Sequence, residues 1–339
     1  ARTAILQRLD TGEIDLVVGT HALFQDAIRF RDLGLAIIDE QHRFGVHQRM
    51  LLSAKARKTS DVLIMTATPI PRTLAMTAYG DMDVSRLDER PPGRKPVDTR
   101  VLPKDRADAV VARLRGLMGR GERAYWICPL VDDGSESEAA AAEARFRELQ
   151  QQFGDRVGLV HGRLKPEEKD AALVAFAEGR TSLLVATTVV EVGVDVPEAT
   201  VIVIEDAERF GLAQLHQLRG RVGRGDKPGH CLLLYRPPLG ETARKRLEVL
   251  RGTDDGFLIA EEDFRLRGGG DLLGTRQSGL PPMKLARVER DQDLLAAAHD
   301  DARLIVNRDP ELQGKRGPDL RTLLYLFERD AAIRYLKSG

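Results

Sequence analysis

Short apolar runs that stop abruptly at polar residues constrain the fold of this chain more than any other feature of its sequence. Residues 35–38, Leu-Ala-Ile-Ile, end in two carboxylates, and similar runs lie at 15–20, 61–65 and 200–204. A strand of a parallel sheet is buried on both faces, so it reads as a continuous apolar run rather than as an alternation. Segments with helical periodicity separate these runs. Together they predict an α/β fold built on parallel sheets.

A proline-rich segment divides the chain. Residues 88–96 carry three prolines and a glycine among charged residues, which is typical of a linker between domains. A length of 339 residues also suits two to three domains. We therefore predict one α/β domain at 1–90, a complete doubly wound domain at 91–238, and a C-terminal helical segment at 239–339, where the pattern becomes less regular.

The overall composition is balanced. The chain has 52 basic and 52 acidic residues and a formal net charge of +0, so nucleic-acid binding would depend on the local placement of arginine and lysine. No apolar run approaches the ~18 residues of a membrane span, and the first residues do not resemble a signal peptide. Cys128 and Cys231 fit no metal-ligand spacing and adjoin apolar runs. We expect buried, reduced thiols, which suit a cytosolic protein.

The two carboxylates after the run at 35–38 suggest nucleotide chemistry. The carboxyl end of a parallel strand opens into the crevice where ligands of an α/β sheet bind. There Asp39 could hold a hydrated Mg²⁺ against nucleotide phosphates, and Glu40 could orient the attacking water. Thr66 and Thr68 end the next strand and could bond to a carboxylate or to water. On this stretch alone, a strand that ends in solvated acids is an equally good interpretation.

A second motif combines arginines with glycines. Residues 214–224 read Gln-Leu-His-Gln-Leu-Arg-Gly-Arg-Val-Gly-Arg. On a helix, Gln217, Arg221 and Arg224 would share one face, and the glycines between the arginines would let a phosphate approach closely. Planar guanidinium groups that reach ATP from another domain would act as arginine fingers. A basic surface helix is the alternative, but two glycines inside it would each cost about 1 kcal/mol.

A third polar segment follows the run that ends at Ala186. Residues 186–197 include Thr187, Thr188, Gly193 and Asp195. The segment reads as a loop and a short helix that could touch both a nucleic-acid backbone and a nucleotide. Taken alone, a buried strand followed by a turn is the favoured interpretation.

Together these motifs resemble those of superfamily 2 helicases. The matches are 18–21 with motif Ib, 39–42 with motif II, 66–68 with motif III, 186–196 with motif V and 214–224 with motif VI. The order and spacing of the motifs agree across both predicted domains.

A narrower resemblance is to the RecG family, bacterial helicases that remodel stalled replication forks. It rests on residues 39–46, 68–73, 208–212, 264–268 and 274–279. Transcription-repair coupling factors share much of this pattern but typically carry Glu where Gln41 stands.

The resemblance implies roles for individual residues. The ATP and catalytic site would consist of Asp39, Glu40, His42, Gly193, Asp195, Gln217, Arg221 and Arg224, with Asp39 on the metal. DNA binding and coupling would involve Gly19, Thr20, Thr66, Thr68, Thr187, Thr188, Arg267 and Gln277. Residues 257–279 resemble the helical hairpin and loop that couple ATP turnover to translocation. Without the resemblance, a packed helical layer would be the better interpretation of this segment.

The resemblance also implies an architecture and an activity. We expect two RecA-like doubly wound parallel-sheet domains, the first incomplete, followed by a C-terminal helical segment. The activity would be ATP-dependent translocation on double-stranded DNA that remodels stalled forks and Holliday junctions in recombination and repair. ATP and Mg²⁺ would be the cofactors. Branched DNA and a single-stranded DNA-binding protein would be the partners of a monomer located in the bacterial cytoplasm, at the nucleoid.

One expected element is missing from the sequence. No Gly-x-x-x-x-Gly-Lys-[Ser/Thr] occurs, so the phosphate-binding Walker A loop and the family's DNA-binding wedge domain are expected before residue 1. The chain is then predicted to be a C-terminal fragment that does not hydrolyse ATP by itself. A transcription-repair coupling translocase and a non-catalytic module that docks DNA or a partner protein remain as alternatives.

Overall fold

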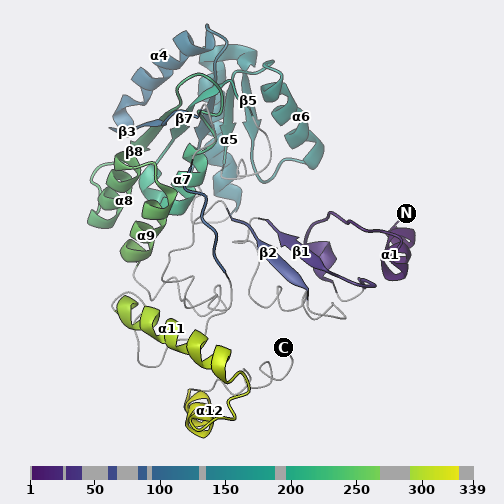
Figure 1. The fold of residues 1–339 in the computed structure, drawn as a ribbon. Helices are drawn as coiled ribbons and strands as arrows, with labels where there is room; N and C mark the ends of the chain where they lie inside the picture. The colour runs from purple at the N-terminus through teal and green to yellow at the C-terminus, as the bar shows by residue number, and fades with distance from the viewer. Residues whose placement is uncertain are drawn as a thin grey trace. The chain divides into compact units, whose positions relative to one another are not determined.

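The computed structural model describes residues 2–25, 28–39, 60–66, 83–89, 94–129, 135–187, 196–267 and 291–327 (Figure 1). The chain divides into two compact units. The first consists of Ala1–Met82 together with Arg267–Gly339, and the second of Asp83–Leu266. We describe each unit by itself.

The second unit contains a parallel sheet of six strands in the order β3-β8-β7-β4-β6-β5 (Figure 1). The strands are β3 (Asp98–Pro103), β4 (Arg123–Ile127), β5 (Val157–Val160), β6 (Leu183–Ala186), β7 (Ala199–Ile204) and β8 (His230–Tyr235). Every neighbouring pair is parallel. The predicted α/β fold with a parallel sheet is therefore confirmed.

Helices cover both faces of this sheet. On β4, Tyr125 and Ile127 point into one core, whereas Ala124 and Trp126 point into the other. The helices are α4 (Ala107–Met118) and α5 (Ser135–Phe153) on the Trp126 side, and α6 (Pro166–Ala177), α7 (Leu212–Arg219), α8 (Glu241–Gly252) and α9 (Gly256–Arg267) on the other. This burial on two faces is why the strands read as unbroken apolar runs.

Helix α8 and most of α9 belong to the second unit. Leu247, Leu250 and Ile259 join the same apolar core as α7, and α8 packs against β3, α7 and the 3₁₀ turn η6 (Ala207–Arg209). The compact unit therefore extends beyond the position where the helical segment was expected to begin. The domain boundaries drawn from the sequence remain predictions.

The first unit contains a pair of parallel strands, β1 (Leu35–Ile38) and β2 (Asp61–Ile64), which pair from Leu35 with Asp61 to Ile38 with Ile64. Both were predicted from the apolar runs. Helix α1 (Arg2–Thr11) precedes them and ends at Gly12, whose φ is +75°. The other described elements of this unit are η1 (His21–Phe24), α11 (Gln292–Arg308) and α12 (Gly317–Leu326).

The strand predicted at 15–20 is wrong. Residues 15–19 form no strand in the structure, and the side chains of Leu16 and Val18 are 80% and 88% exposed. An apolar run becomes a strand only when it pairs with a neighbouring strand. In the described part of this unit, the sheet consists of β1 and β2, and residues 15–20 do not join it.

Two expectations from composition can be compared with the structure. Cys128 and Cys231 are free and buried, as predicted, and burial raises the pKa of the Cys231 thiol to about 12. None of the helices in the described ranges is long and apolar enough to cross a membrane.

Candidate nucleotide and DNA site

Several of the residues predicted to act lie outside the described residues. These are Glu40, His42, Thr68, Thr188, Gly193, Asp195 and Gln277, and the side chain of Arg267. The others are described: Gly19, Thr20, Asp39 and Thr66 in the first unit, and Thr187, Gln217, Arg221 and Arg224 in the second.

In the first unit, Asp39 and Thr66 lie at neighbouring strand ends. Asp39 directly follows β1, and Thr66 lies two residues beyond β2. The parallel pairing continues past Ile38, since its carbonyl accepts a bond of 2.8 Å from the Met65 amide. Asp39 is exposed, so its carboxylate is accessible at the carboxyl edge of this sheet, where α/β proteins bind ligands.

Gly19 and Thr20 form the entry to the 3₁₀ turn η1. The Thr20 carbonyl accepts a bond of 3.0 Å from the Leu23 amide. A Cβ added to Gly19 would lie 2.9 Å from Cγ of Leu23, so the turn packs closely on this glycine. The Thr20 side chain is exposed and could reach a ligand outside the unit.

In the second unit, the two candidate arginines lie on a loop and not on a helix. Helix α7 ends at Arg219, and Gly223 adopts a φ of +71°. The amides of Arg221 and Val222 bond to the carbonyls three residues before them, which tightens the chain as it leaves the helix. The prediction that Gln217, Arg221 and Arg224 share a helical face is therefore wrong, because α7 already ends at Arg219 and both arginines follow it.

We call residues 220–229 the arginine loop. Its glycines allow close backbone packing: a Cβ on Gly229 would lie 2.9 Å from Gly223 Cα, and one on Gly225 would lie 2.8 Å from the Pro197 carbonyl oxygen. At Gly223, an added Cβ would lie 3.2 Å from Val97. These contacts give the three glycines a packing role, and the close approach of a phosphate to Gly223 stays a prediction.

Arg219 has a structural role that the sequence interpretation missed. Its side chain is buried and donates to the carbonyls of Leu250 and Thr253 at 2.7 and 2.8 Å, where α8 ends. It also lies 3.1 Å from Asp254 and 3.0 Å from Nδ1 of His216. Helix ends leave carbonyls unpaired, and a cation there is favourable. Arg219 thus fastens α7 to the end of α8.

The histidine beside Arg219 is held neutral. Burial, followed by the nearby Arg219 cation, lowers the pKa of His216 to about 4. A neutral imidazole can accept a hydrogen bond from the Arg219 guanidinium at Nδ1. The end of α7 therefore holds Arg219, which is buried, bonded to His216, which is half-buried. On the loop that follows, Arg224 is exposed.

Thr187 lies at the carboxyl edge of the second sheet. It follows β6 and is 1% exposed, and among the described residues its Oγ1 has no hydrogen-bond partner. The adjacent strand β5 is followed by His161, which is also buried and whose Nδ1 has no partner within the same part of the chain. Burial lowers the pKa of His161. Two unsatisfied polar atoms at one sheet edge could serve a ligand or the neighbouring loop.

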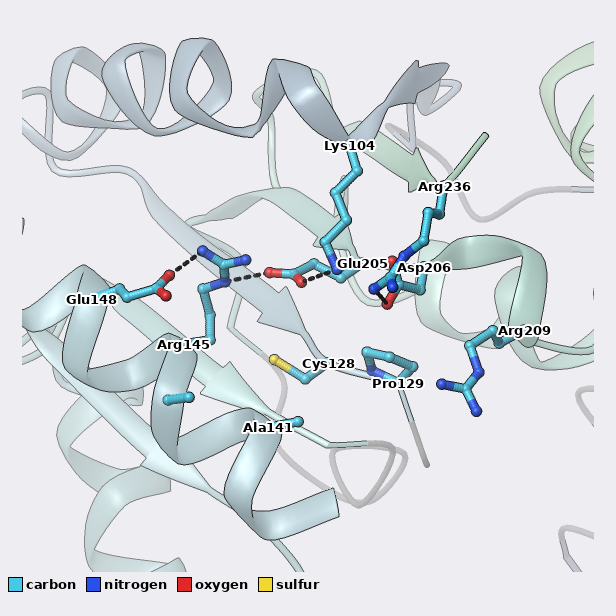
Figure 2. Close-up of a pocket in the computed structure, with 11 residues that line it drawn as sticks. Lys104, Cys128, Pro129, Ala141, Arg145, Glu148, Glu205, Asp206, Arg209 and Arg236 are labelled. Atoms are coloured by element: carbon cyan, nitrogen blue, oxygen red, sulfur yellow. Dashed lines mark hydrogen bonds and ion pairs between the residues drawn. The ribbon is translucent and has the colours of Figure 1, made fainter. Parts of the chain in front are cut away.

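A pocket of about 270 Å³ lies at the carboxyl ends of β4 and β7 (Figure 2). Glu205 and Asp206 line it and are both buried. Lys104 Nζ lies 3.2 Å from Glu205 and 2.8 Å from Asp206, and Arg236 lies 3.1 Å from Asp206. Figure 2 shows the Arg145 guanidinium between Glu148 and Glu205, in contact with both.

Glu205 and Asp206 directly follow the apolar strand β7, just as Asp39 and Glu40 follow the apolar run at 35–38. Here the acids are matched by cations, and Trp126 Nε1 donates to Glu205 at 2.6 Å. Both carboxylates are therefore engaged by cations or by the indole, which does not suit a general base. The pattern that singled out Asp39 and Glu40, an apolar strand followed by two carboxylates, thus also occurs at Glu205 and Asp206, where both acids are paired with cations.

Three family descriptions match the chain. Residues 1–77 match the DEAD/DEAH box helicases, and residues 107–226 match the helicase conserved C-terminal domain. Residues 253–323 match the C-terminal part of domain 3 of the ATP-dependent DNA helicase RecG. Individual relatives agree: the chain is 50% identical over 320 residues to ATP-dependent DNA helicase RecG of Pasteurella multocida, across 93% of this chain and 46% of that protein.

The chain belongs to the RecG family. It is also 52% identical over 316 residues to RecG of Escherichia coli strain K12, across 92% of this chain and 46% of the relative. The chain therefore spans just under half the length of these relatives. Two RecA-like domains and C-terminal helices are the architecture of the family, as the sequence predicted.

A solved RecG structure is also similar. The structure of RecG bound to a three-way DNA junction matches with a TM-score of 0.64 and 46% identity, over 87% of this chain and 38% of that one. The match to the RecG-specific domain 3 favours this family over the transcription-repair coupling factors.

Proposed function

We propose that this chain contributes the motor of a RecG helicase, which uses ATP to translocate on double-stranded DNA and to remodel forks and Holliday junctions in recombination and repair. The observation that carries the proposal is about 50% identity to RecG proteins along 93% of the chain. That similarity runs through both units and includes the RecG-specific segment at 253–323.

In the first unit, Asp39 is the proposed metal-side residue and Glu40 the water-side residue. An exposed carboxylate at the edge of a parallel sheet suits Mg²⁺, which takes one or two carboxylates and keeps phosphate and water as its other ligands. When bound, Mg²⁺ would neutralise charge that develops on the phosphates. Asp39 would hold the cation, and His42 would complete the same motif.

In the second unit, the arginine loop is the proposed source of positive charge for ATP hydrolysis. Arg221 and Arg224 follow a helix that Arg219 fixes to α8, so the loop starts from an anchored point. Gln217 lies on the last full turn of that helix. Gly193 and Asp195 are proposed to contribute from the neighbouring motif.

DNA contacts are proposed at the remaining motif residues. The full set is Gly19, Thr20, Thr66, Thr68, Thr187, Thr188, Arg267 and Gln277. We propose branched duplex DNA as the substrate, a single-stranded DNA-binding protein as a partner, and a monomer that works in the bacterial cytoplasm.

The 339-residue polypeptide tested alone is proposed to lack ATPase activity. It contains acidic and arginine motifs but no Gly-x-x-x-x-Gly-Lys-[Ser/Thr] for the triphosphate. Phosphate release should stay at background with Mg²⁺ and fork DNA present. Magnesium-dependent, DNA-stimulated release by the pure polypeptide would refute this proposal.

The motor proposal is tested in a full-length RecG protein that carries this sequence. Asp39→Asn keeps the size of the side chain and removes its charge, so ATP-driven unwinding of a three-way junction should be lost while junction binding persists. Arg113→Ala, on the exposed face of α4, is the matched control and should unwind normally. Unwinding at the normal rate by Asp39→Asn would favour the alternative of a non-catalytic binding module.

A further inference from the structure

The end of the inter-domain linker lies along the arginine loop. Arg94 Nη2 donates to the Gly220 carbonyl at 3.1 Å, and Lys95 Nζ donates to the Asp226 carbonyl at 2.9 Å. The Asp98 amide donates to the Gly229 carbonyl at 2.9 Å. These bonds span the loop from its first residue to its last. Residues 94–98, which join the end of the linker to the first residue of β3, therefore form one wall of the loop.

The contacts are made to backbone carbonyls and to a glycine. Val97 packs against Gly223, since a Cβ there would lie 3.2 Å from its Cγ2. Gly223 is the residue whose left-handed φ sets the course of the loop. The linker thus contacts the backbone that determines where the arginine side chains begin. Contacts of this kind depend on the loop's conformation and not on which side chains it carries.

One carbonyl joins the linker to a candidate arginine. The Gly220 carbonyl accepts from Arg94 Nη2 and from Arg224 Nε, each at 3.1 Å. A carbonyl oxygen has two lone pairs, so it can accept both bonds at once. The two guanidinium groups carry like charge and meet at this oxygen. Removing Arg94 would leave the Arg224 bond to that carbonyl in place and would change the electrostatic field around Arg224.

Arg94 also lies near the anchored part of the helix. Its cation is among the charges that lower the pKa of His216, after burial and Arg219. The segment that contains Arg221 and Arg224 is therefore held at two places. Arg219 bonds the end of α7 to the end of α8, and Arg94 bonds the Gly220 carbonyl to the linker.

We propose that Arg94 is a positioning residue for ATP hydrolysis, which ties the inter-domain linker to the Gly220 carbonyl and thereby orients Arg224. This rests on the proposed function of the arginine loop. The end of the linker lies inside the second unit and contacts this loop at Arg94 and Lys95, before the chain enters β3 at Asp98. Displacement of the linker would then shift the loop and alter the hydrolysis rate.

The test uses a full-length RecG protein that carries this sequence, with steady-state, fork-stimulated ATP hydrolysis as the measurement. Arg94→Ala should lower kcat by about 10-fold and change the KM for ATP by less than about 2-fold, because the residue orients a group rather than binding ATP. Arg94→Lys keeps a charged donor and should restore most of the rate. Arg100→Ala is the matched control, since Arg100 pairs with Asp98 at 2.8 Å, and it should be normal.

A double variant separates positioning from general stabilisation. If Arg94 acts through Arg224, then Arg94→Ala should lower kcat no further in a protein that already carries Arg224→Ala. An unchanged kcat for Arg94→Ala, an equal loss in Arg100→Ala, no recovery in Arg94→Lys, or independent effects in the double variant would overturn the proposal. Normal hydrolysis by Arg224→Ala would instead refute the proposed role of the loop itself.

Discussion

At the scale of single residues, neighbouring arginines of one motif do different work. Arg219 is 3% exposed and bonds to two carbonyls, whereas Arg224 is exposed on the loop that follows. A signal for this difference was present: Leu212, Leu215 and Arg219 are spaced at i, i+3 and i+7, so Arg219 continues the buried face of α7. Burial of a charged residue is rare without partners, and those partners lie 31 or more residues away.

Replacement of Arg219 should destabilise the second unit. Arg219→Ala leaves the carbonyls of Leu250 and Thr253 and the Asp254 carboxylate without their buried cation, which should lower the free energy of unfolding by about 3 kcal/mol. Urea unfolding measures the change. Arg113→Ala, at an exposed position of α4, should change the same quantity by less than about 0.5 kcal/mol. Equal effects of the two substitutions would contradict the anchoring role.

His216 should make stability depend on pH. Burial, with Arg219 and Arg94 opposed by Asp254 and Asp255, lowers its pKa from 6.5 to about 4 in the folded state. The unfolded chain therefore binds the proton more readily. The stability that His216 contributes is fully present above pH 6.5 and is lost as the pH falls toward 4.

The measurement is the free energy of unfolding of His216→Gln beside the unchanged protein. The Gln side chain keeps an acceptor for Arg219 but does not titrate. The unchanged protein should lose on the order of 2 kcal/mol more than His216→Gln between pH 6.5 and pH 4. Parallel pH profiles for the two proteins would show that His216 is not held neutral by the fold.

At the scale of elements, strands were predicted well and the arginine motif was not. The run at 200–204 became β7, which begins one residue earlier at Ala199, because a strand buried on two faces leaves an unbroken apolar run. The shared helical face of Gln217, Arg221 and Arg224 was mistaken because α7 ends at Arg219, before both arginines, and residue spacing does not reveal where a helix ends. Two carboxylates after a strand could also be read as either a catalytic or a structural pair. The sequence does not show which, because the cation that pairs with Asp206, Lys104, lies 102 residues away in the chain.

Two glycine substitutions should have opposite effects on stability. Gly223→Ala puts a Cβ on a left-handed residue 3.2 Å from Val97, so the free energy of unfolding should fall by about 1–2 kcal/mol. Gly116→Ala lies inside the exposed face of α4, with Arg120 4.0 Å away, and should raise it by about 0.5–1 kcal/mol. Thermal or urea unfolding checks both signs. A neutral Gly223→Ala would mean that the loop tolerates another path.

At the scale of the whole molecule, family and fold could be predicted further than the site. The order and spacing of the motifs were enough to predict the family, and the apolar runs were enough to predict parallel sheets. The partners of a buried charge come from distant parts of the chain, so the pairing of Glu205 with Lys104 and Arg145 was not readable. The contact between linker and arginine loop was likewise invisible, because it joins Arg94 to a carbonyl 126 residues away.

The arginine loop of the second unit is proposed to serve ATP hydrolysis in a RecG motor. The most direct measurement is fork-stimulated ATP hydrolysis by Arg221→Ala in a full-length RecG protein that carries this sequence, beside its affinity for a three-way junction. We expect the hydrolysis rate to fall by about 10³-fold, as for arginine fingers, and the junction affinity to stay within about 3-fold of normal. Hydrolysis at the normal rate would contradict it.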